Sequence, residues 1–195
     1  MYNNKMKRII DIIFVLLLIP FLVLFTCIVS ILIKLEDKGP IIYKSKRLGY
    51  KGELYTIYKF RTMKVNSEDI RNEDGSTYNG QFDKRITKVG QFLRKTSIDE
   101  LPQLINVLIG NMSIVGPRPD LPDAIAIYSE FEKQKLNCKP GITGFNQAYY
   151  RNSIEQSKKF SNDVYYVNNI SFILDFKIIF KTIESIVLKK NIHTN

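Results

Sequence analysis

The chain has 195 residues, of which 45% are hydrophobic, and its net charge is +10. The apolar content excludes a disordered polyelectrolyte, while the charge predicts a polyanionic partner: nucleic acid, anionic lipid or a phosphorylated substrate. Two cysteines and a single histidine, His193, provide neither a disulfide framework nor zinc-ligand spacing. This cysteine usage fits a reducing cytoplasm, and histidine-based catalysis is not expected.

The first predicted element is an apolar helix over residues 9–33, interrupted only by Asp11, Pro20, Thr26 and Ser30. At about 1.5 Å per residue, a straight helix of this length extends about 37 Å, enough to cross a hydrocarbon core of about 30 Å. No small-residue cleavage site follows it, so a removable signal peptide is not expected. The segment therefore predicts a membrane anchor.

Two models of this anchor are compatible with the sequence. Pro20, near the centre, removes a backbone hydrogen bond and kinks a helix. Cationic residues stand on both sides of the segment, and such residues prefer the cytoplasmic face. A re-entrant helix, which enters and leaves by one leaflet, satisfies both flanks, whereas an ordinary single-pass anchor only tolerates the proline. The flanking cations are Lys5, Lys7 and Arg8 before the segment and Lys34, Lys38, Lys44, Lys46 and Arg47 after it.

Short elements are predicted in the middle of the chain. Residues 41–63 alternate apolar and polar side chains around the turn residues 49–52, which is typical of a β-hairpin. The polar, glycine-containing stretch 66–83 indicates an exposed loop. Residues 91–96 and 101–109 are expected to form short helices.

The C-terminal third is expected to contain more helix. Residues 113–122 hold three prolines and should be extended, 123–136 should be helical, and 139–144 should form a turn. Helices are also predicted over 154–167 and 175–190. The apolar stripe of the last helix either packs on the core or lies on an anionic membrane surface. The stripe consists of Phe176, Ile179, Phe180, Ile183, Ile186 and Val187.

An adjacent acidic pair, Asp99 and Glu100, has a structural interpretation. Ser97 and Glu100 have the spacing of a helix capping box, and Asp99 is itself a good N-cap residue. Pro102 would then fall in the first turn of the helix.

The surroundings of the pair also permit a catalytic interpretation. A carboxylate among cations is favoured in its anionic form, which can attack phosphorus, as in enzymes that form an aspartyl-phosphate. A neighbouring carboxylate can hold Mg²⁺, and arginines can bind phosphoryl oxygens through two hydrogen bonds. The nearby cations are Arg85, Lys88, Arg94, Lys95 and Arg118.

Several motifs in this chain occur together in one enzyme family. They are KFRTM at 59–63, DKRITKVG at 83–90, LRKTSIDELPQL at 93–104, MSIVGPRP at 112–119 and PGITG at 140–144. In combination and order, from residue 7 to the C-terminal helix, they resemble the monotopic phosphoglycosyl transferases, the bacterial sugar transferase family. The chain is similar to the minimal catalytic form of that family.

The resemblance implies a helix-rich α+β fold. Residues 1–38 would form a re-entrant membrane helix broken at Pro20, and residues 39–195 a small cytoplasmic catalytic domain with a β-hairpin and amphipathic surface helices. The family resemblance thus favours the re-entrant model over the spanning one. It implies a location at the bacterial inner membrane, with the catalytic domain on the cytoplasmic face.

The resemblance also implies a ping-pong reaction. Asp99 would attack the β-phosphate of a UDP-sugar, release UMP and form a covalent phosphosugar–aspartate. A polyprenyl phosphate such as undecaprenyl phosphate would then accept the sugar phosphate. Glu100, with Asp99, would hold Mg²⁺. The product would begin a capsule, O-antigen, exopolysaccharide or glycoprotein glycan, which downstream glycosyltransferases would extend, and no nucleic acid would take part.

Phosphate or nucleotide binding is expected, on the same resemblance, at a set of basic and proline residues. Three positions depart from the family pattern, namely Ser45, Phe145 and Tyr150, and the last two affect any inference about the sugar rather than the reaction. The expected binding residues are Lys59, Arg61, Arg85, Arg94, Pro117, Arg118, Pro119 and Arg151.

Two other functions are compatible with parts of the sequence. A membrane-tethered module that binds nucleic acid or another polyanion would use the positive charge and the aromatic residues. It would leave an acidic pair inside a basic field without explanation. An inactive scaffold of the same fold would not require Asp99 and Glu100 to be intact.

Overall fold

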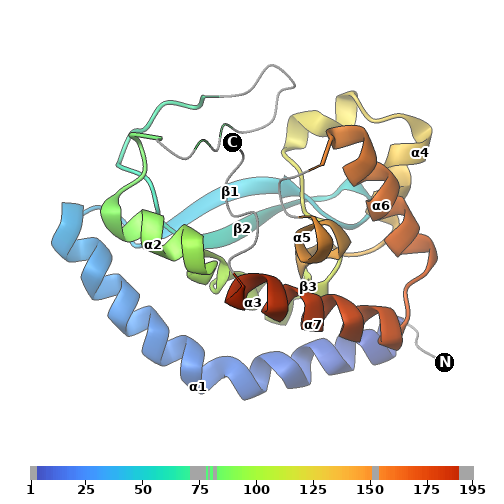
Figure 1. Ribbon diagram of the computed structural model, residues 1–195, viewed down its shortest axis with the longest axis horizontal. Coiled ribbons are helices and arrows are strands. Elements are labelled where there is room, and N and C mark those ends of the chain that lie inside the picture. Colours follow the sequence, from blue (N-terminus) through green and yellow to red (C-terminus); the bar gives the residue numbers. More distant parts are fainter. Residues whose placement is uncertain (1–3, 71–77, 79, 81–82, 151–153, 189–195) are drawn as a thin grey trace.

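The computed structural model describes residues 4–70, 78, 80, 83–150 and 154–188. It confirms the helix-rich α+β class. An antiparallel hairpin crosses the middle of the molecule, with α2, α3 and α7 below it and the long α1 beneath them (Figure 1). The strands are β1 (Ile42–Leu48), β2 (Leu54–Phe60), β3 (Ser113–Val115) and β4 (Gly141–Thr143), and the α-helices are α1 (Asn4–Asp37), α2 (Lys88–Thr96), α3 (Gln103–Ile109), α4 (Glu130–Lys133), α5 (Phe145–Tyr149), α6 (Gln156–Asn168) and α7 (Phe172–Val187).

The long helix α1 contains Pro20 and bends near its middle (Figure 1). Its most apolar 18-residue stretch has a mean hydropathy of 3.2, and only 11% of this stretch is buried within the protein. An apolar surface of this size is unfavourable in water, so it indicates association with a membrane. The helix is long enough to cross a bilayer, and its length alone does not distinguish the spanning from the re-entrant model.

The N-terminal arm of α1 is attached to the globular part by polar contacts. Arg8 donates to the carbonyl oxygens of Val107 and Leu108, the second over 2.8 Å, at the C-terminal end of α3. A cation at this position complements the negative end of the helix dipole. The buried carboxylate of Asp11 accepts the N–H of Ile114 over 3.1 Å. This arm is therefore positioned by α3 and β3.

The C-terminal arm of α1 is attached in the same manner to other elements. Glu36 accepts the N–H groups of Lys88 and Val89, over 2.7 and 3.0 Å, which lack partners within α2. Asp37 forms an ion pair with Arg61. Both ends of the apolar helix thus contact a single globular body.

The predicted hairpin is confirmed. Its strands pair from Ile42 with Phe60 to Leu48 with Leu54, and η1 (Tyr50–Gly52) connects them. Asn106 of α3 is fully buried beside β2. Its side chain donates to the carbonyl of Thr56 over 2.7 Å and accepts the N–H of Tyr58 over 3.1 Å, so it completes the hydrogen bonding of the strand edge.

The capping prediction for the acidic pair is wrong. Helix α2 begins at Lys88, earlier than expected, because the Thr87 hydroxyl accepts the N–H of Gly90 over 2.9 Å. It ends at Thr96 and is followed by Ser97, whose φ of 58° is left-handed and whose side chain makes no capping hydrogen bond. Asp99 lies inside the 3₁₀ turn η2 (Ile98–Glu100) rather than at an N-cap. The predicted second helix is confirmed as α3, which ends at Gly110 with a φ of 102°.

Two predictions for the C-terminal third are also wrong. Residues 123–136 do not form one helix, because Ser129 starts a new one with a complete capping box to Glu132. The segment divides into η3 (Pro122–Ala126), α4 and η4 (Gln134–Asn137). The predicted turn at 139–144 contains β4, which pairs in parallel with β3. Of the stretch 113–122 that was predicted to be extended, β3 covers the first three residues, and η3 begins at Pro122. The helix predicted over 154–167 is confirmed as α6.

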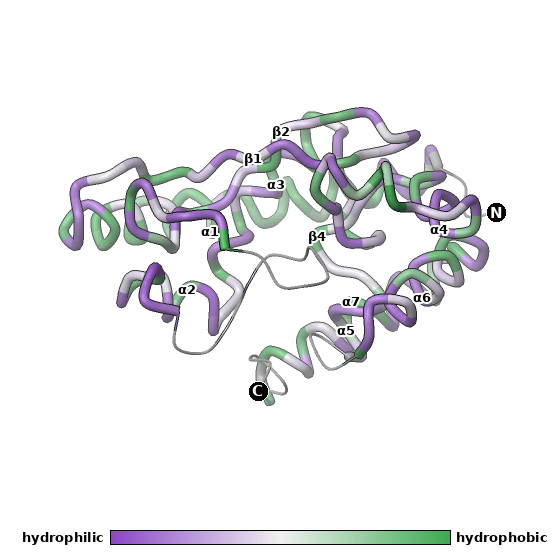
Figure 2. The backbone as a smooth tube through the Cα atoms, turned by 90° about the horizontal axis from the view of Figure 1, so that it is seen from above, coloured by the Kyte–Doolittle hydropathy of each residue, from purple (hydrophilic) through white to green (hydrophobic). Residues whose placement is uncertain are grey.

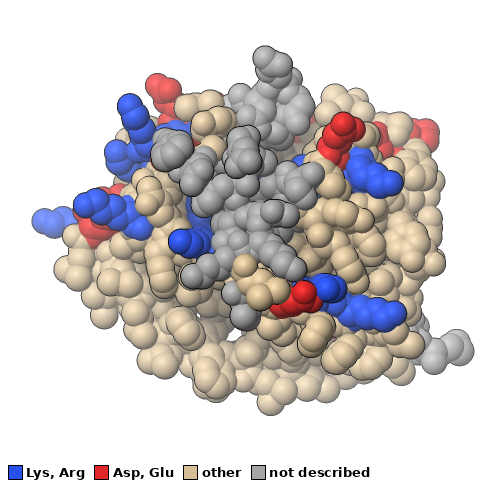
Figure 3. Space-filling model, in the orientation of Figure 1, with Lys and Arg blue, Asp and Glu red and all other residues tan. Residues whose placement is uncertain are grey.

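Helix α7 begins before the predicted range because the Ser171 hydroxyl caps it, accepting the N–H of Leu174. Core packing of its stripe is confirmed for Ile179, and the neighbouring Ile178 is fully buried. Phe176, Phe180 and Ile183 of the stripe are exposed, and their contact with a membrane surface stays a prediction. Figure 3 shows that the lower edge of the molecule, formed by α1, carries few charged side chains, whereas charged side chains are visible over α7 just above it. The exposed apolar residues of α7 are Phe172, Ile173, Phe176, Phe180 and Ile183.

The predicted loop 66–83 is only partly within the described residues. Residues 66–70 belong to no helix or strand, as expected, and most of the remainder lies outside the described part. Figure 2 shows the backbone from above, coloured by hydropathy. The hydrophobic residues are concentrated in α1 and α3 and in parts of α5 and α7.

Replacing Asn106 with alanine should lower the free energy of unfolding by about 2–4 kcal/mol, because it leaves the Thr56 carbonyl and the Tyr58 N–H buried without partners. Urea unfolding in detergent micelles measures this loss. Asn137→Ala, at an exposed position, is the matched control and should change stability little. Equal stabilities of the two variants would contradict the role given to Asn106.

Candidate active site

The acidic pair lies in the turn η2, between α2 and α3, and the two ends of this turn are fixed by apolar contacts. Ile98 and Leu101 pack against a buried cluster that includes Leu93 and Phe60. The backbone bonds Glu100 N–H to Ser97 O and Leu101 N–H to Ile98 O close the turn over 3.3 and 3.1 Å. Because the apolar residues flank the pair, Asp99 and Glu100 are held where hairpin side chains reach them.

Glu100 is bound by cations from two separate elements. Lys59 of β2 donates to its Oε1 over 2.6 Å, and Arg118 contacts the same oxygen over 3.3 Å. Burial raises the pKa of Glu100, but the positive charges of Lys59 and Arg118 outweigh burial and lower the pKa below its ordinary value. Glu100 is therefore ionised at neutral pH, with its Oε2 making no hydrogen bond to any described residue.

Asp99 has a different environment from its neighbour. Burial and the negative charge of Glu100 raise the pKa of Asp99 to about 6, against the opposing effects of Lys59, Arg94 and Arg118. No described residue donates a hydrogen bond to its carboxylate. A carboxylate without hydrogen bonds and with a raised pKa is more basic than an ordinary aspartate, which favours attack on an electrophile.

Arg94 is positioned by the packing of α2. Gly90, one helical turn earlier, lies against the backbone of Thr62, where a Cβ would collide with the carbonyl group. This close approach allows the Arg94 Nε to donate to the Thr62 hydroxyl over 2.9 Å. Burial lowers the pKa of the Arg94 guanidinium, and the negative charges of Asp99 and Asp83 only partly oppose this effect.

The Gly-Pro-Arg-Pro segment is fixed by backbone contacts on both sides. Gly116 N–H donates to the Thr143 carbonyl over 2.9 Å, and Gly141 N–H to the Pro117 carbonyl over 3.0 Å. A Cβ on Gly116 would collide with the 139–141 backbone. The segment thus presents Arg118, whose side chain is 54% exposed, from a rigid support.

A buried ion cluster behind this segment was missed by the sequence analysis. Lys135 pairs with Asp120 over 2.6 Å and with Asp163 over 2.7 Å, and the Tyr128 hydroxyl donates to Asp120. Because Asp120 follows Pro119 directly, the cluster supports the Arg118 segment. In the sequence, the only sign of this cluster was Asp120 directly after the Gly-Pro-Arg-Pro motif. Its partners could not be identified there because they come from segments distant in the chain.

Two of the predicted binding residues have other partners. Arg61 donates to Asp37, to the Pro40 carbonyl over 2.5 Å and to the Met63 carbonyl over 2.9 Å. Arg85 is paired with Asp83 over 2.6 Å and donates to the Glu68 carbonyl. The structure therefore brings Lys59, Arg94 and Arg118 to the acidic pair, and it engages Arg61 and Arg85 elsewhere.

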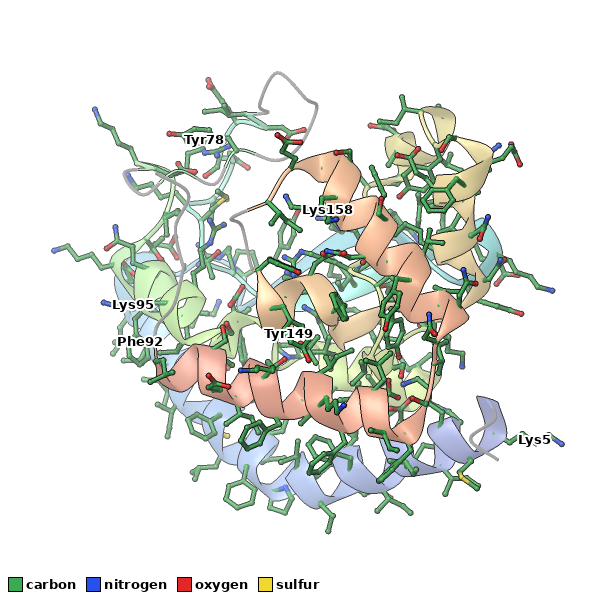
Figure 4. The ribbon with its side chains drawn as sticks, turned by 45° about the vertical axis from the view of Figure 1, so that its right-hand side comes forward. Lys5, Tyr78, Phe92, Lys95, Tyr149 and Lys158 are labelled. Atoms are coloured by element: carbon green, nitrogen blue, oxygen red, sulfur yellow. The ribbon has the colours of Figure 1, made fainter. Side chains whose placement is uncertain are left out.

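Three predicted binding residues remain, and two of them lie in the described part of the chain. Pro117 and Pro119 flank Arg118, whereas Arg151 lies outside the described residues. In Figure 4, Phe92 and Lys95 of α2 lie at the left, far from Lys5 at the N-terminal end of α1, and Tyr78 and Lys158 lie higher in the view. Phe92 is exposed.

The donor set of the pair fits Mg²⁺. Within the described ranges, no cluster of three or more His, Cys, Asp or Glu residues forms a closed metal cage. Mg²⁺ does not require such a cage, since it binds through one or two carboxylates and completes its shell with water and substrate phosphates. The oxygens of Asp99 and the Oε2 of Glu100 are suitable ligands.

The comparisons with known proteins agree with the geometry. The family model described as bacterial sugar transferase matches residues 2–189. The chain is 42% identical to the sugar transferase EpsL of Bacillus subtilis over 96% of this chain and 90% of EpsL. It is 36% identical to the exopolysaccharide production protein ExoY of Sinorhizobium fredii over 94% of this chain and 86% of that protein.

A longer relative carries a more specific name. The UDP-glucose:undecaprenyl-phosphate glucose-1-phosphate transferase of Escherichia coli is 38% identical over 93% of this chain, which spans only 40% of that protein. The chain belongs to the bacterial sugar transferase family, a family of phosphoglycosyl transferases.

Replacing Thr62 with valine should reduce turnover by about three- to tenfold, because Arg94 loses the acceptor that orients it. The measurement is steady-state turnover, together with the melting temperature. Thr96→Val is the matched control, since its hydroxyl donates only to carbonyls of its own helix. If both variants lost the same activity, or neither did, Thr62 would have no positioning role.

Proposed function

We propose that this protein transfers a sugar 1-phosphate from a UDP-sugar to a polyprenyl phosphate, releasing UMP and starting a bacterial surface polysaccharide or glycan. The observation that supports it best is the unequal acidic pair. Glu100 is held ionised by Lys59 and Arg118, while Asp99 beside it has a raised pKa and no hydrogen-bond donor among the described residues. The name of the Escherichia coli relative supports the substrate classes.

The first half-reaction begins with the Asp99 carboxylate. One of its oxygens attacks the β-phosphorus of the UDP-sugar, an Asp–O–P bond forms, and the bond from phosphorus to the bridging oxygen breaks. The electron pair leaves with the α-phosphate as UMP. In the second half-reaction, a phosphate oxygen of the polyprenyl phosphate attacks the same phosphorus and the Asp–O–P bond breaks. The carboxylate is regenerated and no redox partner is required.

The neighbouring residues stabilise charge in these steps. Arg94 and Arg118 offer guanidinium groups to the phosphoryl oxygens, and Lys59 neutralises charge near Glu100. Pro117 and Pro119 stiffen the segment that carries Arg118. When bound at Glu100 and Asp99, Mg²⁺ would supply further neutralisation of the diphosphate. Arg61 and Arg85 stabilise the fold through their own carboxylates.

The membrane arrangement follows from the two attachments of α1. Residues 1–38 form a re-entrant helix bent at Pro20, and residues 39–195 form the catalytic domain on the cytoplasmic face. The attachment of both arms to one globular body supports this topology, since a spanning helix would carry one arm to the far side. The exposed apolar face of α7 lies at the membrane surface.

Replacing Asp99 with asparagine should abolish turnover, with a loss of at least about a thousandfold, because the amide cannot form the covalent intermediate. Mass spectrometry after incubation with a panel of UDP-sugars should show the phosphosugar adduct on wild type only. The exposed Asp123→Asn is the control and should retain the adduct. Turnover by Asp99→Asn would remove this residue as nucleophile.

Replacing Glu100 with glutamine should raise the Mg²⁺ concentration for half-maximal UMP release by at least about tenfold, because an anionic ligand is lost. The assay is a Mg²⁺ titration of UMP release with undecaprenyl phosphate. Glu53→Gln, on the exposed hairpin turn, should titrate as wild type. An unchanged titration for Glu100→Gln would exclude a ligand role.

The re-entrant topology predicts that both ends of α1 lie in the cytoplasm. Single cysteines at Asn4→Cys and Lys44→Cys, in a chain with Cys27→Ser and Cys138→Ser, should react with an impermeant maleimide in inverted vesicles and not in intact cells. Reaction of the Asn4→Cys chain from the outside only would establish a spanning helix instead.

A further inference from the structure

Arg47 lies on the same face of the hairpin as the catalytic cation Lys59. It is directly opposite Tyr55 in the antiparallel register, as Tyr43 is opposite Lys59. Paired side chains project to one side of a sheet, and alternate residues of a strand share that side. Tyr55 and Lys59 are separated by an even number of positions on β2, so Arg47, Tyr55 and Lys59 form a row along one face.

Among the described residues, the Arg47 guanidinium has no carboxylate partner. Its side chain is half-buried, and no described carboxylate forms an ion pair with it. Burial and the positive charge of Arg118 lower the pKa of Arg47, with only weak compensation from Asp120 and neighbouring tyrosines. By contrast, the buried Arg61 and Lys135 each have carboxylate partners. An uncompensated cation of this kind destabilises a fold unless an anion joins it.

The hydroxyl of Tyr55, beside Arg47, also lacks a partner. The residue is 6% exposed, and its hydroxyl oxygen is buried without a hydrogen bond. Burial raises the pKa of Tyr55, and the two cations that oppose this effect are Arg47 and Arg118. A buried hydroxyl without a partner is costly, and it is satisfied when a ligand accepts its proton in a hydrogen bond.

Backbone contacts connect this group to the catalytic pair. The N–H of Leu48 donates to the Asp120 carbonyl over 3.0 Å, which fixes the end of β1 against the Arg118 segment. Arg118 in turn reaches Glu100 over 3.3 Å. Arg118 acts electrostatically on both Asp99 and Arg47, whereas Arg47 is not among the charges that act on Asp99. Arg118 therefore connects the acidic pair with Arg47.

We propose that Arg47, with the Tyr55 hydroxyl beside it, is a phosphate-binding subsite that both half-reactions use: it holds the α-phosphate of the departing UMP and then the phosphate of the polyprenyl acceptor. This inference rests on the proposed function. The β-phosphate at Asp99 is within reach of Arg118. The α-phosphate is bonded to the β-phosphorus on the side opposite Asp99. We therefore place the α-phosphate at the next cation, Arg47.

The double use follows from the direction of displacement at phosphorus. Asp99 attacks opposite the bond to the α-phosphate oxygen, which breaks and carries its electron pair away with UMP. The acceptor oxygen must later attack opposite the Asp99 oxygen, from the position that the α-phosphate has left. One cationic subsite on that side therefore binds both phosphates in turn, and UMP and the acceptor should exclude each other.

The test compares wild type with Arg47→Gln, Arg47→Lys and Tyr55→Phe in two measurements. Direct UMP binding to the free, full-length protein in nanodiscs needs no turnover, and turnover gives the KM for undecaprenyl phosphate. Loss of a charge-assisted bond should raise the UMP Kd and the acceptor KM of Arg47→Gln by about tenfold or more. Arg47→Lys should fall between wild type and Arg47→Gln, and Tyr55→Phe should show a smaller increase. UMP should inhibit competitively against the acceptor.

Lys46→Gln is the matched control, because Lys46 is exposed and neighbours Arg47 on the opposite face of the strand. It should bind UMP as wild type does. If Arg47 only stabilised the fold, Arg47→Gln would have a lower melting temperature and unchanged UMP binding, and that result would overturn the proposal. A change in only one of the two quantities, the UMP Kd or the KM for undecaprenyl phosphate, would also overturn it. If wild type binds UMP through Arg47 but releases none from any UDP-sugar, the anion subsite stands and the proposed function fails.

Discussion

The site depends on a single carboxylate oxygen shared by two cations. Oε1 of Glu100 binds Lys59 from the hairpin and Arg118 from the segment after β3, so three separate parts of the chain meet at one atom. Without Glu100, the two cations would repel each other. With it, they are held beside Asp99, where their positive charge is available to a phosphorylated substrate. The same interaction makes the two acidic residues unequal. Glu100 is neutralised by ion pairs, whereas Asp99 has a raised pKa and accepts no hydrogen bond from the described side chains.

The second organising feature is the separation of apolar and charged surfaces. The lower edge of the molecule is formed by α1, and Figure 3 shows the charged side chains above it, those over α7 included. Helix α7 also has exposed apolar residues. The turn that carries Asp99 follows α2, whose Phe92 is exposed. A site at such a boundary suits a reaction in which one substrate is a soluble nucleotide and the other is attached to lipid. The charges attract the nucleotide, while the apolar surface keeps the protein at the bilayer.

Attachment of α1 at both ends gives this arrangement its rigidity. Arg8 and Asp11 bind one arm to α3 and β3, and Glu36 and Asp37 bind the other to α2 and Arg61. These contacts use backbone groups that the helix ends and strand edges leave unpaired, so the membrane helix completes the hydrogen bonding of the globular part. Anchoring and folding are therefore coupled in this protein.

Local chemistry in the sequence determined the class of fold, the hairpin, the membrane helix and the acidic pair, because alternation, apolar run length and motif order are properties of neighbouring residues. The same local rules failed at Ser97, at residues 123–136 and at the strand β4. Ser97 takes a left-handed conformation instead of capping, a cap at Ser129 divides a helix, and β4 exists only because β3 pairs with it. Tertiary structure alone decided which cations reach the acidic pair. Arg61 and Lys59 are two positions apart in one motif, yet the first pairs with Asp37 and the second with Glu100, because their partners come from segments distant in the chain.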